Sequence, residues 1–234
     1  RMHLEIINKC REEVGHDFAI SIKMNSADFQ KGGFSSEDSI QVAKLFSDSG
    51  IDNIEISGGT YEQPRLLGLD NVSINPKRSE NRKESTIARE AYFLSYAEEI
   101  SKVVEIPLMV TGGFRTKAGI QAALDDGACE IVGIGRPLCA NPYAIKELLA
   151  GKISELPKYE KILSIGPWLL SPSSPFRIIQ AINAFSAQAW FYQQIKKMGK
   201  GLMPDLDLKP WKAFREDAME DQKATEKYKN FNLN

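Results

Sequence analysis

The sequence predicts an α/β fold in which helices cover a parallel sheet. Short apolar strands alternate with amphipathic helices along the chain, a pattern typical of parallel sheets. Two successive strands end in glycines, in Pro107–Phe114 (PLMVTGGF) and Ile131–Arg136 (IVGIGR). The usual closed version is the (β/α)8 barrel of about 250 residues. Four strand–helix units use the chain up to about residue 150, and the chain starts inside a helix. We therefore expect about the last four units of such a barrel. The alternative is an open, flavodoxin-like sheet.

Four strands are expected from short apolar runs that end beside glycine or polar residues. They comprise residues 18–24, 51–56, 108–110 and 131–134. An internal repeat supports the second and the fourth, because GIDNIEISG at 50–58 aligns with GACEIVGIG at 127–135. Each copy contains a helix end, a glycine, a short gap, an apolar strand and a second glycine. The repeat indicates that the chain uses one strand–helix unit more than once.

Helices are expected between the strands, where apolar residues recur at helical spacing. They cover residues 1–14, 36–46, 87–104 and 117–125, and Asn141-Pro142 opens another. Gly15 is the expected end of the first helix, and Ser36 is the expected N-cap of the second. Residues 57–86 form a long polar loop, of a length typical of lids and binding loops.

Two domains are predicted: a half-barrel with a phosphate site at residues 1–155, and a helical extension docked on it at 156–234. A long helix is expected at 178–198, and the charged segment 217–229 is interpreted as a frayed, disordered end. Trp168, Trp190 and Trp211 are interpreted as core and docking residues. Half a barrel exposes two sheet edges, so we expect poor stability of the isolated chain.

The composition argues against several classes of protein. The 234 residues carry a formal net charge of −1, which does not favour binding to nucleic acid or to an anionic membrane. No apolar run approaches the roughly 20 residues that span a bilayer, and no signal peptide is recognisable. Cys10, Cys129 and Cys139 are far apart and predict neither disulfides nor a metal site. We therefore expect a cytoplasmic protein without metal that acts on a small molecule.

The first glycine-ended strand predicts an anion site. Gly112 and Gly113 lack a Cβ, so their N–H groups, with the start of the next helix behind them, can approach an anion closely. The following strand ends in Gly133–Arg136 and adds a guanidinium group. The glycines could instead serve only to turn the chain. Because two consecutive strands share the pattern, a phosphate site is the favoured interpretation.

Lys23 lies inside an apolar strand, where a charge needs a partner or a ligand. Two interpretations stay open: an ion pair with Glu55 on the neighbouring strand, or a position at the barrel mouth facing an electron-rich ring. The polar residues 25–28 could bind substrate or close their own loop. Tyr61 could stack on a ring or protonate it, or pack on its own loop.

With these motifs, the chain resembles the Old Yellow Enzyme family of NADH:flavin oxidoreductases, and specifically its carboxyl-terminal half. The matching segments run in order from residue 1 to about 212: IKMNSADF at 22–29 with GGF at 32–34, IEISGGTYE at 54–62, VTGGFR at 110–115, IGRPL at 134–138 with NP at 141–142, and MPD at 203–205. The specificity lies in the ordered set of segments rather than in any single one.

The resemblance implies a TIM barrel of the FMN-linked oxidoreductase type. In that family NADH or NADPH reduces FMN, which then reduces an activated C=C bond or a quinone-like acceptor, as in ene-reductases. Lys23 is implied to face the flavin pyrimidine and to stabilise the anionic reduced ring. The residues implied to surround the FMN phosphate are Gly112, Gly113, Phe114, Gly135 and Arg136. The family's substrate-anchoring and proton-donating residues belong to its first half, upstream of Arg1, so no catalytic residue is assigned here.

Two other functions stay open. One is a catalytically incomplete half-barrel that binds FMN or phosphate weakly, or pairs with a second copy or with a missing amino-terminal half. The other is a different FMN barrel, such as a tRNA dihydrouridine synthase, which shares the glycine motifs but should have a basic surface. Residues 156–210 contain no cysteine, which argues against the iron–sulfur branch of the resembled family.

Overall fold

A computed structural model describes residues 1–28, 32–58 and 93–231 of the chain. These residues divide into two compact units. The first unit takes residues 1–28, 32–58, 93–135 and 148–155, and the second takes 136–147 and 156–231. Each unit has its own cluster of buried apolar side chains.

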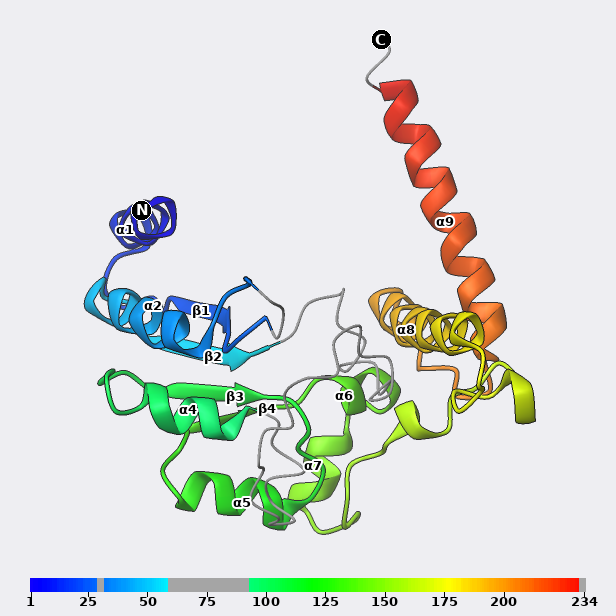
Figure 1. The fold of residues 1–234 in the computed structure, drawn as a ribbon, viewed down its shortest axis with the longest axis horizontal. Helices are drawn as coiled ribbons and strands as arrows, with labels where there is room; N and C mark the ends of the chain where they lie inside the picture. The colour runs from blue at the N-terminus through cyan, green and yellow to red at the C-terminus, as the bar shows by residue number, and fades with distance from the viewer. Residues whose placement is uncertain (29–31, 59–92, 232–234) are drawn as a thin grey trace. The chain divides into compact units, whose positions relative to one another are not determined.

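The first unit contains a four-stranded parallel sheet in the order β1-β2-β3-β4 (Figure 1). The strands are β1 (Ser21–Asn25), β2 (Asn53–Ser57), β3 (Leu108–Thr111) and β4 (Ile131–Gly133). Because all four run in one direction, their carboxyl ends lie along one edge of the sheet. The four predicted strands and their parallel arrangement are confirmed, with small shifts at their ends.

One face of this sheet carries the core of the first unit. The helices α1 (Met2–Val14), α2 (Ser36–Asp48), α4 (Leu94–Ile100) and α5 (Lys117–Asp125) precede or follow the strands. Ile54, Ile56 and Val110 are fully buried and cluster with Ala43 of α2 and Ala97 of α4. Alternate residues of each strand point to the opposite face, as the pleat requires.

The ends of the first-unit helices follow the sequence closely, with one correction. Gly15 ends α1 with a φ of 76°, as predicted. The N-cap of α2 is Ser35 rather than Ser36: Ser35 Oγ accepts from the Asp38 N–H, and the Asp38 carboxylate accepts from the Ser35 N–H. The capping box needs an acid three residues after the cap, and Asp38 stands in that relation to Ser35. Of the helix expected at 87–104, residues 94–100 are helical and 87–92 lie outside the described residues.

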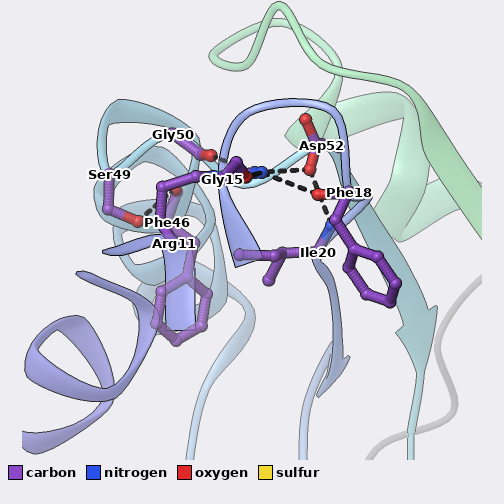
Figure 2. A network of polar contacts seen from close by, with 8 residues as sticks. All are labelled: Arg11, Gly15, Phe18, Ile20, Phe46, Ser49, Gly50 and Asp52. Atoms are coloured by element: carbon purple, nitrogen blue, oxygen red, sulfur yellow. Dashed lines mark hydrogen bonds and ion pairs between the residues drawn. The ribbon is translucent and has the colours of Figure 1, made fainter. Parts of the chain in front are cut away.

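A polar network joins α1 to the chain just before β1 and β2 (Figure 2). The Arg11 guanidinium donates to the carbonyls of Gly15, Phe18 and Gly50 at 2.7–2.9 Å and to Asp52 Oδ2 at 2.6 Å. Asp52 Oδ2 also accepts from the backbone N–H of Ile20. One largely buried guanidinium therefore ties three carbonyls and a carboxylate together at the amino-terminal edge of the sheet.

After β4 the chain is helical. The elements are α6 (Arg136–Ala140), α7 (Ala144–Leu149), the 3-10 turns η2 (Tyr159–Lys161) and η3 (Trp168–Leu170), α8 (Arg177–Gly199) and α9 (Pro210–Phe231). In the second unit α8 packs against the first part of α9, which extends beyond it (Figure 1). Trp190 of α8 is fully buried, stacks on Tyr159 and donates from Nε1 to the Leu208 carbonyl.

The expectations for this helical part have different outcomes. The charged segment 217–229, which was expected to be frayed, lies within helix α9. Trp190 is a core residue as predicted, but Trp168 and Trp211 have 90 % and 52 % of their surface exposed. Asn141-Pro142 opens the turn that leads into α7, as expected: Asn141 Oδ1 accepts from the Tyr143 N–H, the Asn141 carbonyl accepts from the Ala144 N–H, and the regular helix begins at Ala144. Within the described residues, no helix is long and apolar enough to cross a membrane.

Candidate functional site at the carboxyl edge of the sheet

The two glycine-ended strands are neighbours in the sheet. Thr111 of β3 and Gly133 of β4 are register partners, so the loops that follow them leave the sheet side by side. Gly112 and Gly113 have φ values of 131° and 87°. Residues with a Cβ rarely adopt these angles. Both positions therefore favour glycine because of their backbone conformation. The two glycine motifs therefore lie at one edge of the sheet, and the phosphate site expected there stays a prediction.

The glycine pair leads into the amino terminus of α5. Thr116 is the N-cap of this helix, and its Oγ1 accepts from the Gly119 N–H at 3.0 Å. Phe114 is 1 % exposed and belongs to the core cluster. Its side chain therefore packs inward, and the group it could offer to a ligand is its backbone N–H. A helix start beside two flexible N–H donors is an arrangement that suits an anion.

The glycines after β4 differ from each other. A Cβ on Gly133 would overlap Thr111 Oγ1 and lie 2.7 Å from Met109 Cε, whereas a Cβ on Gly135 would meet nothing within 4 Å. Gly133 is thus needed for close packing between β3 and β4, and Gly135 leaves open space at the edge. Arg136 begins α6 and belongs to the second unit, so its approach to the glycines stays a prediction.

Lys23 and Glu55 form the ion pair that the sequence left as one of two interpretations. They are register partners on β1 and β2, and Lys23 Nζ donates to Glu55 Oε1 at 2.7 Å. The Lys23 side chain is 58 % exposed and that of Glu55 is 19 % exposed. The exposed ammonium still has N–H donors beyond the one that Glu55 accepts, so the ion pair does not exclude a role facing a ligand.

The pair lies on a polar face of the sheet, opposite the apolar core. Next to it, Ser21 donates to Asn53 Oδ1 at 2.8 Å, and Asn53 Nδ2 donates to the Pro107 carbonyl. Thr111 of β3 lies two residues beyond Met109, the register partner of Glu55, and so points to this face as well. Parallel sheets are usually apolar on both faces, which makes this row of polar side chains notable.

Two hydroxyls at the carboxyl edge are buried without a hydrogen-bond partner among the described residues, and sequence reasoning missed both. They are Ser26 Oγ, directly after β1, and Thr111 Oγ1, at the end of β3. A Cβ on Gly58 would lie 2.9 Å from Ser26 Oγ, so Ser26 packs over the glycine that follows β2. Buried hydroxyls without partners are costly. Only Thr111 directly precedes a glycine pair in the sequence, so no common signal marks the two hydroxyls.

The loop after β1 closes on itself. Asn25 Nδ2 donates to Asp28 Oδ1, and Asp28 Oδ2 accepts from the Phe34 N–H. Asp28 N also donates to the Phe34 carbonyl. The sequence left two roles open for residues 25–28, substrate binding and closure of their own loop. These contacts close the loop. Tyr61 lies outside the described residues.

Cys129 and Cys139 offer no activated thiolate. Burial raises the pKa of Cys129 to about 11, and burial also raises the pKa of Cys139. A thiolate is the reactive form of cysteine, so both thiols are protonated near neutral pH. Cys129 is a core residue of the first unit, as predicted.

Similar proteins are found by sequence and by structure. An NADH-dependent flavin oxidoreductase of Hypocrea jecorina is 36 % identical over 172 residues, which are 71 % of this chain and 40 % of that protein. Another, from Talaromyces variabilis, is 29 % identical over 86 % of this chain and 47 % of its own length. A solved structure of a 2-naphthoyl-CoA reductase matches 65 % of this chain and 22 % of its own, with 25 % identity and a TM-score of 0.52. No family model matches.

The chain spans less than half the length of these relatives. The similarity nevertheless runs over most of the chain, and both sequence relatives described above are NADH-dependent flavin oxidoreductases. The structural likeness agrees with the parallel α/β sheet of the first unit. Over most of its length, the chain is therefore a homologue of NADH-dependent flavin oxidoreductases.

Proposed function

We propose that this chain forms the cofactor-holding part of an FMN-dependent NAD(P)H oxidoreductase of the ene-reductase kind, built on a (β/α)8 barrel. The observation that carries the proposal is the pair of adjacent glycine-ended strands, β3 and β4, at one edge of a parallel sheet. Phosphate sites of such barrels lie after two successive strands at this edge. The relatives' names support a flavin and favour NADH as the electron donor.

The residues at this edge suit the phosphate end of FMN. Gly112 and Gly113 hold positive φ values that turn the chain toward α5, and successive N–H groups in such turns form anion-binding concavities. Gly135 leaves room beside them. The buried hydroxyls of Ser26 and Thr111 lack partners among the described residues and are donors that a bound polar ligand would satisfy.

The polar face of the sheet suits the ring end. When bound, FMN would supply the chemistry of accepting a hydride and passing it on. The chain's own part is to orient the ring and to place the Lys23 ammonium where negative charge develops. The acceptor that we propose is an activated C=C bond or a quinone-like compound. We assign no residue of this chain to substrate anchoring or proton delivery.

The direct test is to titrate the 234-residue chain with FMN, riboflavin and inorganic phosphate, following flavin fluorescence and calorimetric heat. We expect FMN to bind at least about tenfold more tightly than riboflavin, because the phosphate contributes charge-assisted hydrogen bonds. Equal affinity for FMN and riboflavin would contradict a phosphate site. Flavin binding without NADH oxidation would favour the catalytically incomplete half-barrel.

A matched pair of variants separates binding from strain. Gly113→Ala and Gly127→Ala both place a Cβ at a positive φ, 87° and 68°. Gly127 precedes β4, at the amino-terminal edge of the sheet, away from the proposed phosphate site. We expect both variants to be destabilised and only Gly113→Ala to lose the preference for FMN over riboflavin. Loss of that preference in both would show a general effect of strain.

A further inference from the structure

We propose that Glu55 is a positioning residue for Lys23. Its carboxylate holds the lysine ammonium at one point of the polar sheet face and offsets part of the charge that the ammonium presents to the flavin. The inference rests on the proposed function, because it concerns the ring end of the same site. The two interpretations of Lys23, an ion pair with Glu55 and a position facing the flavin ring, are then compatible. The ion pair holds the ammonium in the position from which it contacts the ring.

The pair is built into the register of the sheet. Lys23 and Glu55 are directly opposite each other on β1 and β2, and their charged atoms are 2.7 Å apart. Glu55 is the more buried partner, with 19 % of its side chain exposed against 58 % for Lys23. The carboxylate on the short, buried side chain is therefore the fixed point, and the long lysine side chain is the group that it restrains.

Lys23 and Glu55 are the two charged residues in the row of register partners that crosses the sheet. The same row continues across the sheet with Met109 of β3 and Ile131 of β4, which are both apolar. On the side toward the amino terminus, Ser21 and Asn53 pair with each other. An ammonium has three N–H donors, and the bond to Glu55 uses one. Lys23 can thus keep its carboxylate partner while donating to a ring acceptor.

The charge of Glu55 should set how strongly the site prefers the reduced, anionic flavin. A carboxylate in contact with the ammonium reduces the positive potential that the pair presents. Glu55→Gln keeps the side-chain shape and an acceptor oxygen but removes the negative charge. We expect this variant to bind reduced FMN more tightly relative to oxidised FMN, and Lys23→Met to show the opposite change.

The first experiment needs no flavin. Trace acetylation of the 234-residue chain, read by mass spectrometry, reports how freely each lysine amine leaves its carboxylate partner. We expect Glu55→Gln to raise the labelling rate of Lys23 severalfold. Lys44 is the internal control, because it is also 58 % exposed and pairs with Asp48 at 3.2 Å, and its rate should not change. An unchanged rate at Lys23 would overturn the proposal that Glu55 restrains it.

The second experiment measures the dissociation constants of oxidised and reduced FMN under anaerobic conditions. Glu55→Gln should change their ratio severalfold when Lys23 is present, and by less than about twofold in the Lys23→Met background, because residues in contact couple. Equal changes in both backgrounds would show that Glu55 acts independently of Lys23. If the unmodified chain bound no FMN, the proposed function would fail, while the labelling experiment would still decide whether Glu55 restrains Lys23.

Discussion

At the scale of residues, Gly133 and Gly135 show how one motif can hold glycines for different reasons. Gly133 faces Thr111 across the β3–β4 ladder and has no room for a Cβ, whereas Gly135 has open space. In the sequence the two are equivalent members of a glycine-ended strand. What separates them is a contact with a residue 22 positions earlier in the chain, which sequence spacing does not report.

This difference predicts opposite outcomes for two conservative changes. Gly133→Ala should lower the free energy of unfolding by about 1–3 kcal/mol, because Thr111 is β-branched and cannot rotate freely away from the added methyl. Gly135→Ala should stay within about 0.5 kcal/mol of the unmodified chain. Urea denaturation of both variants measures the difference. Equal stability of the two would contradict the packing described here.

Asp52 gives a pH dependence at the same scale. The Ile20 N–H and the Arg11 guanidinium hold the pKa of Asp52 below its ordinary value. The unfolded chain therefore binds the proton more readily, so this stabilisation is present above about pH 4 and is lost as the pH falls through the lower folded pKa. We expect Asp52→Asn to be less stable than the unmodified chain at neutral pH, with the difference shrinking below pH 4.

The measurement is the urea midpoint of both proteins from about pH 7 down to pH 3. Asp126→Asn is a suitable control, because Asp126 is exposed at the end of α5. Its difference from the unmodified chain should show no comparable loss on acidification. A difference at Asp52 that grew as the pH fell would reverse the sign of the argument.

Among elements, the strands were the part of the fold that sequence predicted best. The repeat that aligns residues 50–58 with 127–135 marks β2 and β4, and both leading glycines, Gly50 and Gly127, have positive φ. Buried strands of a parallel sheet are short, apolar and bounded by turns, so their signal is local. The charged residues near the carboxyl terminus suggested a frayed end, and the segment is part of helix α9. Lys196 of α8 binds Asp217 and Glu220 of α9 at 2.6–2.7 Å, a contact between distant segments.

The start of α2 provides the prediction for a single element. Ser35 accepts from the Asp38 N–H and completes a capping box, although Ser36 next to it is an equally good capping residue by type. Ser35→Ala should therefore cost about 1 kcal/mol of unfolding free energy, and Ser36→Ala only a few tenths. Thermal unfolding of the two variants side by side decides the matter. A larger loss for Ser36→Ala would place the cap where the sequence first suggested it.

For the whole molecule, the motifs predicted the family and the sheet. Two domains were expected, at 1–155 and 156–234, but residues 136–147 belong to the second compact unit. Gly135 and Arg136 are adjacent in one motif and yet fall in different units. Ser26 and Thr111 come together at one edge only because β1 and β3 flank β2. Such groupings depend on the register of several strands at once, so the buried hydroxyls could not be proposed from sequence. The glycine pair and Lys23 could, because their signals are local.

The last prediction concerns the stability of the complete chain. A ligand that binds the folded state alone raises the unfolding free energy by RT ln(1 + [L]/Kd), or about 2.7 kcal/mol at one hundred times Kd. The four-stranded sheet has two strands, β1 and β4, with a neighbour on one side only among the described residues, so the free chain should have little stability to spare. FMN should therefore raise its thermal midpoint in a concentration-dependent way, and riboflavin should do so less.

The unfolding midpoint should also separate the two ends of the site. Gly113→Ala should abolish the advantage of FMN over riboflavin, because that advantage comes from the phosphate. Lys23→Met should keep the advantage but reduce the stabilisation by reduced flavin, because the ammonium acts on the ring. Differential scanning fluorimetry in an aerobic and an anaerobic series measures both effects. If neither flavin shifted the midpoint of the unmodified chain, this stretch of sequence would not bind the cofactor by itself. That result would favour the catalytically incomplete half-barrel.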